Sequence, residues 1–325
     1  MRIPFVNFVA LALVVILPAL SYGQSVPSQK LQTVPNSLNF IVMGDWGRVG
    51  EDHQKPVAVQ MGKTAKEAGT EFVIATGDNF YPKGVVSEYD PLWKYSFEDI
   101  YTAFSLQRDW YPVLGNHDYG SNPDAQIAYS KISRRWRMPA RYYSKKFAIN
   151  GDTTNQVLIA FIDTNPLIPG YYRDGDYGPN AKSQDTTAQK IWLEKLLQQN
   201  SANPNVKWKL VVGHHPMYTG SDKRRNSHDT RSARGSLKPL IDKYKVDAYI
   251  AGHEHSLQHI VPAPGRTHHF VSGAASEATQ VGMLPESKFA QTQYGFMLFS
   301  VSAQKILVQV IDFNGNVIYT TEVKK

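Results

Sequence analysis

Cysteine is absent from this 325-residue sequence. A chain without cysteine has no disulfide, no thiolate metal site, no cysteine nucleophile and no lipid-modified amino-terminal cysteine. Any metal ion must therefore sit on nitrogen and oxygen ligands, for which 10 His and 28 Asp plus Glu are available. The absence of cysteine therefore excludes sulfur-ligated metal sites, but a metal site with nitrogen and oxygen ligands stays possible.

Long runs of one charge are also missing, although 35 Lys plus Arg against 28 Asp plus Glu give a net charge of +7. The visible basic clusters are short: Arg134, Arg135 and Arg137, and the stretch 223–225. Nucleic-acid binding requires a longer basic track, so none is predicted. We expect these clusters to be solvated or to attract a small anionic substrate. Oligomeric state is left open.

Only one long apolar run occurs, from Phe5 to Leu20, following Arg2 and ending before Ser21. This pattern is typical of a secretory signal peptide, so residues 1–23 are predicted to be removed and the mature protein to be secreted or periplasmic. An uncleaved amino-terminal anchor is the alternative. No later segment is apolar enough to span a membrane.

The remaining sequence has a globular composition without internal repeats. Residues 24–37, rich in Ser, Pro and Gln, are interpreted as a flexible leader, and residues 38–325 as one catalytic domain. Apolar β-like runs then alternate with helical patterns, which indicates an α/β fold with a buried parallel sheet. The predicted strands are 40–43, 72–74, 110–114, 157–162, 208–212, 248–251, 269–271, 296–301, 306–310 and 317–321.

Helices are predicted at 56–68, 125–133, 187–199 and 237–244. In the third, Ala188, Ile191, Trp192 and Leu196 form the expected apolar face. The irregular stretch 165–186 is too long for a simple connector, and we interpret it as a lid over a site.

Polar residues follow five of the predicted strands, where parallel strands of one sheet would bring them to one rim. Taken singly, each is more often a turn residue or a structural histidine. The Asp-x-Gly pattern even recurs at Asp176 without a preceding apolar strand. The combination favours a metal centre, and its sequence blocks are Gly44–Gly47, Gly77–Tyr81, Gly115–Asp118, Gly213–His215 and Gly252–His255.

Together these blocks resemble the purple acid phosphatases, within the calcineurin-like metallophosphoesterases. The family pattern DxG, GDxxY, GNH(D/E), VxxH, GHxH is complete and in order, and residues 125–136 (AQIAYSKISRRW) resemble the mammalian tartrate-resistant type. The resemblance implies a four-layer sandwich of two packed mixed β-sheets flanked by helices, and the alternation of elements supports it.

The resemblance also implies a ligand set. Asp45, Asp78, Tyr81 and His255 would bind a ferric ion. Asp78 would bridge to a divalent iron, zinc or manganese ion held by Asn116, His214 and His253. Carboxylate and phenolate oxygens suit a hard trivalent ion, whereas imidazoles suit a borderline divalent one.

The implied activity is hydrolysis of small phosphate monoesters in acid, with a metal-bound hydroxide as nucleophile. His117 would contact the phosphoryl group and protonate the leaving alcohol. His228 is the candidate for a second family histidine. Its alternative is an exposed loop residue, because the segment after His214 is longer than the mammalian pattern leads us to expect.

Two other functions stay open. One is a phosphodiesterase or nucleotidase of the same superfamily. The presence of Tyr81 argues against this alternative, because other branches of the superfamily generally lack that tyrosine. The other is a non-catalytic secreted binding protein, but no ligand of the family pattern is lost.

Overall fold

The computed structural model describes Met1 and residues 30–325. A mixed six-stranded sheet has the order β13-β12-β11-β1-β2-β3. Within it, β1 and β2 are parallel, as are β2 and β3. Its strands are β1 (Leu38–Met43), β2 (Phe72–Ala75), β3 (Asp109–Pro112), β11 (Gly295–Val301), β12 (Lys305–Asp312) and β13 (Val317–Lys324).

A mixed seven-stranded sheet has the order β10-β8-β9-β7-β6-β5-β4. Its central strands β5, β6, β7 and β9 run parallel to one another. The strands are β4 (Tyr143–Ile149), β5 (Asp152–Phe161), β6 (Val206–Val212), β7 (Ala248–Ala251), β8 (Leu257–Ile260), β9 (His268–Ser272) and β10 (Ser287–Gln291).

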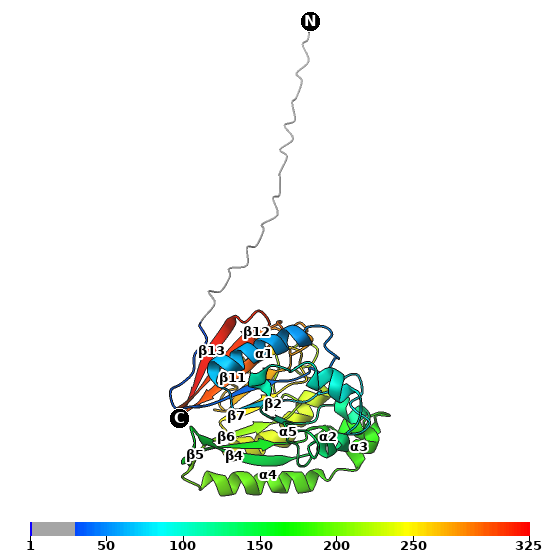
Figure 1. Ribbon diagram of the computed structural model, residues 1–325, viewed down its shortest axis with the longest axis horizontal. Helices are drawn as coiled ribbons and strands as arrows, with labels where there is room; N and C mark the ends of the chain where they lie inside the picture. Colours follow the sequence, from blue (N-terminus) through cyan, green and yellow to red (C-terminus); the bar gives the residue numbers. More distant parts are fainter. Residues whose placement is uncertain (2–29) are drawn as a thin grey trace.

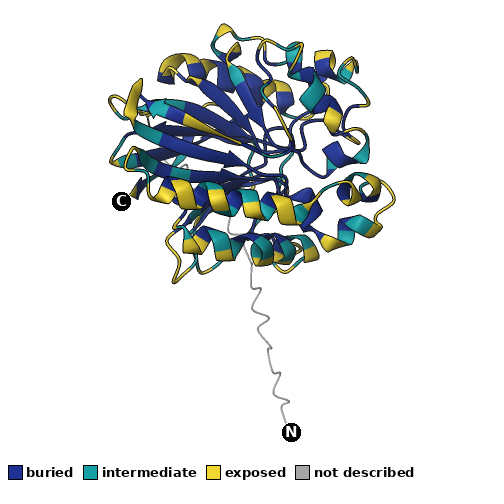
Figure 2. Cartoon of the chain, turned by 90° about the horizontal axis from the view of Figure 1, so that it is seen from below, coloured by how far each residue is buried: buried dark blue, intermediate teal, exposed yellow. Residues whose placement is uncertain are grey.

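The two sheets pack face to face through aromatic side chains. Phe72 of β2 stacks on Phe147 of β4 with ring centroids 4.1 Å apart, and Phe270 of β9 meets Phe299 of β11 at 5.4 Å. Helix α1 (Gln54–Ala68) covers the outer side of the six-stranded sheet and α4 (Thr186–Ser201) that of the seven-stranded sheet (Figure 1). The strands are largely buried, whereas the helices expose one side (Figure 2). The predicted four-layer α/β sandwich is confirmed.

Three observed strands, β4, β8 and β10, were not predicted from the sequence, and their positions and composition explain why. β4 and β10 are the two edges of the seven-stranded sheet. Edge strands carry exposed polar residues and therefore lack a continuous apolar run. β8 lies inside the sheet, but half of it consists of the buried polar residues Gln258 and His259.

The predicted apolar face of α4 is right for Trp192 and Leu196, which pack partly buried against the core, and wrong for the exposed Ala188 and Ile191. Its buried positions include Gln189, Leu193 and Leu197, whereas Ile191 is 62% exposed. The Gln189 side chain accepts a hydrogen bond from the Asp163 backbone N–H at 2.8 Å and donates one to its carbonyl at 2.9 Å. These two hydrogen bonds to the residue that follows β5 orient α4 so that the helix face with Gln189, Leu193 and Leu197 packs against the sheet.

Helix α5 (His228–Lys243) begins nine residues before its predicted start. Ser227 caps it by accepting a hydrogen bond from the Thr230 N–H. The first half of this helix is polar, so the spacing of apolar residues gave no helical signal there. Helix α2 (Asp124–Tyr129) ends earlier than predicted. The stretch 165–186 contains two 3₁₀ helices, Asn165–Leu167 and Pro169–Arg173, and helix α3 (Gly178–Lys182).

The amino-terminal segment is only partly described. Residues 30–37 of the predicted leader dock on the six-stranded sheet: the Gln32 N–H donates to Gln309 Oε1 at 2.8 Å and the Val34 N–H to Ser300 Oγ at 2.7 Å. The flexible-leader prediction is therefore wrong for this part. The predicted signal peptide, apart from Met1, lies outside the described residues. Within residues 30–325, no helix has the length and apolar character needed to cross a membrane.

Candidate metal centre

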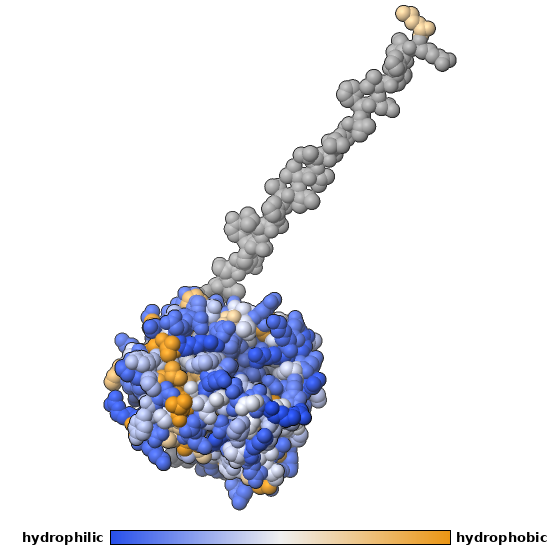
Figure 3. All heavy atoms as spheres, turned by 90° about the vertical axis from the view of Figure 1, so that its right-hand side faces the viewer, coloured by the Kyte–Doolittle hydropathy of each residue, from blue (hydrophilic) through white to orange (hydrophobic). Residues whose placement is uncertain are grey.

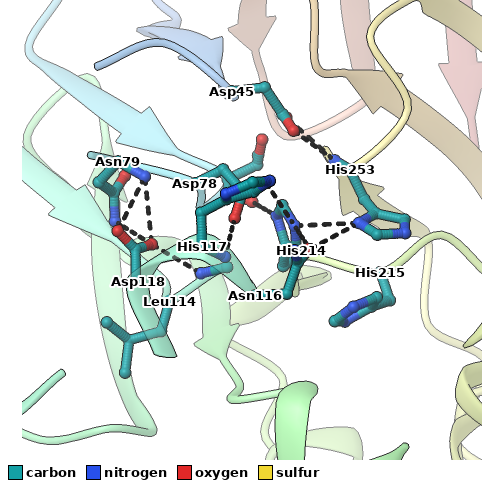
Figure 4. A network of polar contacts seen from close by, with 12 residues as sticks. Asp45, Asp78, Asn79, Leu114, Asn116, His117, Asp118, His214, His215 and His253 are labelled. Carbon is teal, nitrogen blue, oxygen red and sulfur yellow. Dashed lines mark hydrogen bonds and ion pairs between the residues drawn. The ribbon is translucent and has the colours of Figure 1, made fainter. Parts of the chain in front are cut away.

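The five polar loops meet, but they leave two sheets rather than one rim. Asp45, Asp78 and Asn116 follow β1, β2 and β3 of the six-stranded sheet. His214 and His253 follow β6 and β7 of the seven-stranded sheet. The site lies at the junction of the carboxyl ends of both sheets, where Figure 4 shows these side chains pointing towards one another.

Left-handed backbone places three of these side chains directly after their strands. The φ angles are +59° at Asp45, +48° at Asp78 and +67° at His253. Holding a non-glycine residue in the left-handed region generally costs about 1–3 kcal/mol of conformational energy. Aspartate tolerates this region better than most residues do. The loops also approach one another closely, since a Cβ on Gly115 would lie 2.1 Å from Asp78 N. Glycine at 115 is thus a packing requirement of the site.

The first ligand group surrounds the Tyr81 hydroxyl. Its oxygen lies 3.4 Å from Asp45 Oδ1, 3.2 Å from Asp78 Oδ2 and 3.1 Å from His255 Nε2. His255 Nε2 is also 3.5 Å from Asp45 Oδ1. We call Asp45, Asp78, Tyr81 and His255 the oxygen-rich set.

The second ligand group shares Asp78. Its Oδ2 lies 3.4 Å from His214 Nε2, which is 3.2 Å from Asn116 Oδ1 and 3.3 Å from His253 Nδ1. Asn116 Oδ1 is 2.9 Å from His253 Nδ1. We call Asp78, Asn116, His214 and His253 the imidazole set. The structure thus brings all seven predicted ligands together in two groups that meet at Asp78.

The chemistry of these donors fits metal ions. One oxygen or nitrogen each from Asp45, Asp78 and His214 falls within 4.8 Å of the others, and all three residues are buried. Burial, together with the carboxylates of Asp78 and Asp45, raises the pKa of Tyr81 well above 10. Burial alone would also raise the pKa of Asp78, but His214 and its neighbours hold it well below the usual range. Buried carboxylates facing a phenol and imidazole nitrogens form a site suited to cations.

His117 lies at the centre without belonging to either group. Its backbone N–H donates to Asp78 Oδ1 at 2.8 Å, and its Nδ1 lies 2.6 Å from the Pro82 carbonyl oxygen. Because a carbonyl only accepts, Nδ1 carries a proton, and Nε2 is directed to the site, 4.0 Å from Asp78 Oδ2. The ring is one-third exposed and lies 4.5 Å from the Tyr81 ring.

His228 lies at the periphery. It is the first residue of α5, its side chain is 49% exposed, and its ring lies beside Gly170. Its neighbour Asp229 reaches further inwards, with Oδ2 3.7 Å from His253 Nε2. The carboxylate of Asp176, in the second Asp-x-Gly match, is 53% exposed and pairs with Lys83 Nζ at 2.9 Å instead of facing the ligand groups.

His215 is a buried residue of the site that sequence reasoning missed. Its ring lies 4.5 Å from the His253 ring, with Nδ1 2.8 Å from Thr164 Oγ1 and Nε2 2.9 Å from the Tyr171 hydroxyl. Burial lowers the pKa of His215 well below 6.5. Its position directly after His214 was the available signal.

The stretch 165–186 covers the imidazole set. Besides the Tyr171 contact, the Asn116 amide donates to the Tyr177 hydroxyl at 3.2 Å. From another loop, Arg224 Nη1 lies 2.6 Å from His253 Nε2. The face of the molecule seen in Figure 3 is mostly hydrophilic, with one narrow hydrophobic strip.

Asp118 ties the loops after β2 and β3 together. Its carboxylate accepts hydrogen bonds from the N–H groups of Asn79, Phe80 and Gly115 and from the Gln126 side chain, at 2.8–3.2 Å. Asp118 closes the GNH(D/E) block and Gln126 belongs to the AQIAYSKISRRW stretch, so both sequence signals mark a support for the ligand loops.

Similarity to known proteins agrees with this geometry. The family model described as calcineurin-like phosphoesterase matches residues 38–257. Purple acid phosphatase 17 of Arabidopsis thaliana is 36% identical over 274 residues, covering 80% of this chain and 77% of the relative. The chain belongs to the purple acid phosphatases of the calcineurin-like phosphoesterase family. Tartrate-resistant acid phosphatase type 5 of Oryctolagus cuniculus is 30% identical over 309 residues, covering 89% of this chain and 91% of the relative.

A solved structure shares the fold of this purple acid phosphatase family member at lower sequence identity. It is titled GAP50, the anchor in the inner membrane complex of Plasmodium, and has a TM-score of 0.75 at 24% identity, with 89% of both chains covered. This likeness concerns the fold alone.

Proposed function

We propose that the protein is a secreted or periplasmic acid phosphatase that hydrolyses small phosphate monoesters with a dinuclear centre. A ferric ion would occupy the oxygen-rich set, and a divalent iron, zinc or manganese ion the imidazole set. The observation that carries the proposal is the geometry of Asp78, whose Oδ2 lies 3.2 Å from the Tyr81 hydroxyl and 3.4 Å from His214 Nε2.

The two sets support different ions by their donors. The oxygen-rich set offers two carboxylates and a phenol beside one imidazole, which suits a hard trivalent ion. A tyrosine stays protonated in acid unless a strongly Lewis-acidic ion holds it as phenolate, so ligation by Tyr81 would require such an ion. The imidazole set offers two imidazoles, an amide oxygen and the shared carboxylate, which suits a borderline divalent ion.

The bound ions would ionise a water molecule in acid and neutralise charge on the phosphoryl oxygens. The side chains of the protein position the ligands and deliver the proton. Asp78 holds the two ligand sets at a fixed spacing. His117, anchored through Nδ1 to the Pro82 carbonyl, keeps Nε2 free to deliver a proton to the leaving alcohol. That step requires a proton on Nε2.

His228 is proposed for a secondary role at the edge of the imidazole set. Its neighbour Asp229 approaches His253 Nε2, and its own ring lies beside Gly170 of the covering stretch.

Metal analysis combined with a pH profile tests the proposal. The purified protein should contain one iron and one divalent ion per chain and hydrolyse 4-nitrophenyl phosphate best in acid. Chelation should abolish the activity and both metals together should restore it. A metal-loaded protein that cleaves only the diester bis(4-nitrophenyl) phosphate would show it to be a phosphodiesterase, and one that cleaves neither ester would be a non-catalytic binder.

Secretion is tested separately by intact-mass measurement on protein from its native host. The expected amino terminus is at or near Gln24, after removal of residues 1–23. A mature protein that still carries residues 1–23 would contradict it.

A further inference from the structure

Arg48, one residue beyond the Asp-x-Gly block, lies against a ligand of the oxygen-rich set. Its guanidinium carbon is 3.7 Å from the centre of the Tyr81 ring. Nη2 of the same group donates to Glu277 Oε2 at 2.6 Å, and Nε donates to Ser276 Oγ at 3.2 Å. The side chain is only 24% exposed, so these contacts hold it over the ring.

Glu277 connects this arginine to a second ligand. Its Oε2 lies 3.2 Å from His255 Nδ1, while His255 Nε2 faces the Tyr81 hydroxyl at 3.1 Å. Glu277 and Arg48 are 229 positions apart in sequence and come from the loops after β1 and β9. Between them, they contact two of the four residues of the oxygen-rich set from outside.

We propose that Arg48 and Glu277 are positioning residues that tune the ferric half of the centre: Glu277 orients His255, and Arg48 sets the electron-donating strength of Tyr81. This inference rests on the proposed function, because it concerns the ion expected in the oxygen-rich set.

The role of Glu277 follows from the two nitrogens of His255. A histidine that offers Nε2 to a metal carries its proton on Nδ1 and is oriented when a carboxylate accepts that proton's hydrogen bond. Glu277 Oε2, an ion-pair contact 3.2 Å from Nδ1, is the carboxylate placed to accept such a bond, and Nδ1 has no hydrogen-bond partner among the described residues. Arg48, which holds the same Oε2, keeps the carboxylate from turning away.

The role of Arg48 follows from its charge. A cation over the face of an aromatic ring stabilises the ring's electrons. A phenolate under such a cation gives up an electron to a ferric ion less readily, so its charge-transfer band lies at shorter wavelength. Removal of the charge should move the band to longer wavelength, a change that a purely structural role would not cause.

The experiment compares Arg48→Gln, Arg48→Lys, Glu277→Ala and Glu277→Gln with the wild type. The readouts are the position of the visible band, the affinity for iron and the thermal melting curve. Arg266→Gln is the matched control, because Arg266 Nη2 forms a similar 2.8 Å bond to Asp247 Oδ1 just before β7, at the opposite end of that strand from His253.

We expect Arg48→Gln to shift the band to longer wavelength and Arg48→Lys, which keeps the charge, to shift it less. Glu277→Ala should bind iron about 10- to 100-fold more weakly, the usual effect of losing such a partner. Glu277→Gln should recover part of this loss, since its amide oxygen can still accept from Nδ1–H. The control should match the wild type in band and affinity.

Each result decides one statement. A folded Arg48→Gln variant with an unshifted band overturns the tuning role of Arg48, and unchanged iron affinity in folded Glu277→Ala overturns the orienting role of Glu277. A wild type that holds ferric iron without visible colour overturns the ferric phenolate of the proposed function, and with it the role of Arg48. Weaker iron binding by Glu277→Ala would then still support the orienting role.

Discussion

The two halves of the centre share one carboxylate but are built differently. The oxygen-rich set is supported by the partly exposed side chains of Arg48 and Glu277, which are 24% and 44% exposed. The imidazole set is backed by the buried His215 and covered by Tyr171 and Tyr177 of the stretch 165–186. Charged side chains near solvent contact both halves, since Arg224 and Asp229 lie beside His253, and the imidazole set has packed aromatic residues over it as well.

Both sheets contribute ligands to the site. Asp45 and Asp78 come from adjacent parallel strands of one sheet, whereas His214 and His253 come from adjacent parallel strands of the other. Asp78 reaches across the junction because its backbone turns into the left-handed region directly after β2. Each set nevertheless combines ligands from both sheets, since Asn116 of the imidazole set follows β3 and His255 of the oxygen-rich set follows β7.

Loss of the shared ligand should have the largest effect. Asp78→Ala should release both metals and lower kcat by about 10³-fold or more, since it removes a contact to both ions. Elemental analysis and 4-nitrophenyl phosphate turnover measure this. Asp176→Ala, at the exposed Asp-x-Gly match, is the control and should behave like the wild type. Equal metal content in the two variants would contradict the bridging role.

Loss of a ligand from one half should separate the two sets. His253→Ala should release the divalent ion but keep iron and colour, with kcat lower by about 10²- to 10³-fold. The reason is that His253 Nδ1 contacts Asn116 and His214, both of the imidazole set. Metal content and the visible spectrum check the result. Loss of both metals together would mean that the two halves do not bind independently.

Replacement of His117, which lies between the two ligand sets, should leave both metals in place. His117→Ala should lower kcat by about 10²-fold, the usual contribution of a general acid. Alkyl phosphates should lose more than aryl phosphates, because poor leaving groups depend more on protonation. Turnover of both substrate types by the metal-loaded variant measures this. Equal losses would instead assign His117 to the phosphoryl oxygens.

The smallest expected loss of activity belongs to the oxygen-rich half. Tyr81→Phe should abolish the purple or pink colour of the oxidised protein while Asp45, Asp78 and His255 retain some iron. We expect kcat to fall by about tenfold, since one ligand of several is lost. Absorption spectra of wild type and variant at equal iron content test the assignment. A variant that keeps its colour would mean that the phenolate is not Tyr81.

Much of the site could be predicted because its blocks are local. Asp45, Asp78 and His253 each follow an apolar strand within three residues, and such strands are recognisable from short apolar runs. The alternation of these runs with helical patterns also predicted the α/β class. The order in which the strands pair is not local, and the sequence alone did not reveal that the ligand loops leave two sheets.

What the sequence by itself determined is the blocks of candidate ligands and the buried central strands, because both depend on side chains adjacent along the chain. The tertiary structure decided the rest. Gln189 faces the sheet because of Asp163, 26 residues away, and Arg48 meets Glu277 across 229 residues. Such contacts leave no periodicity in the sequence, since polar side chains at distant positions pair only when packing brings their loops together.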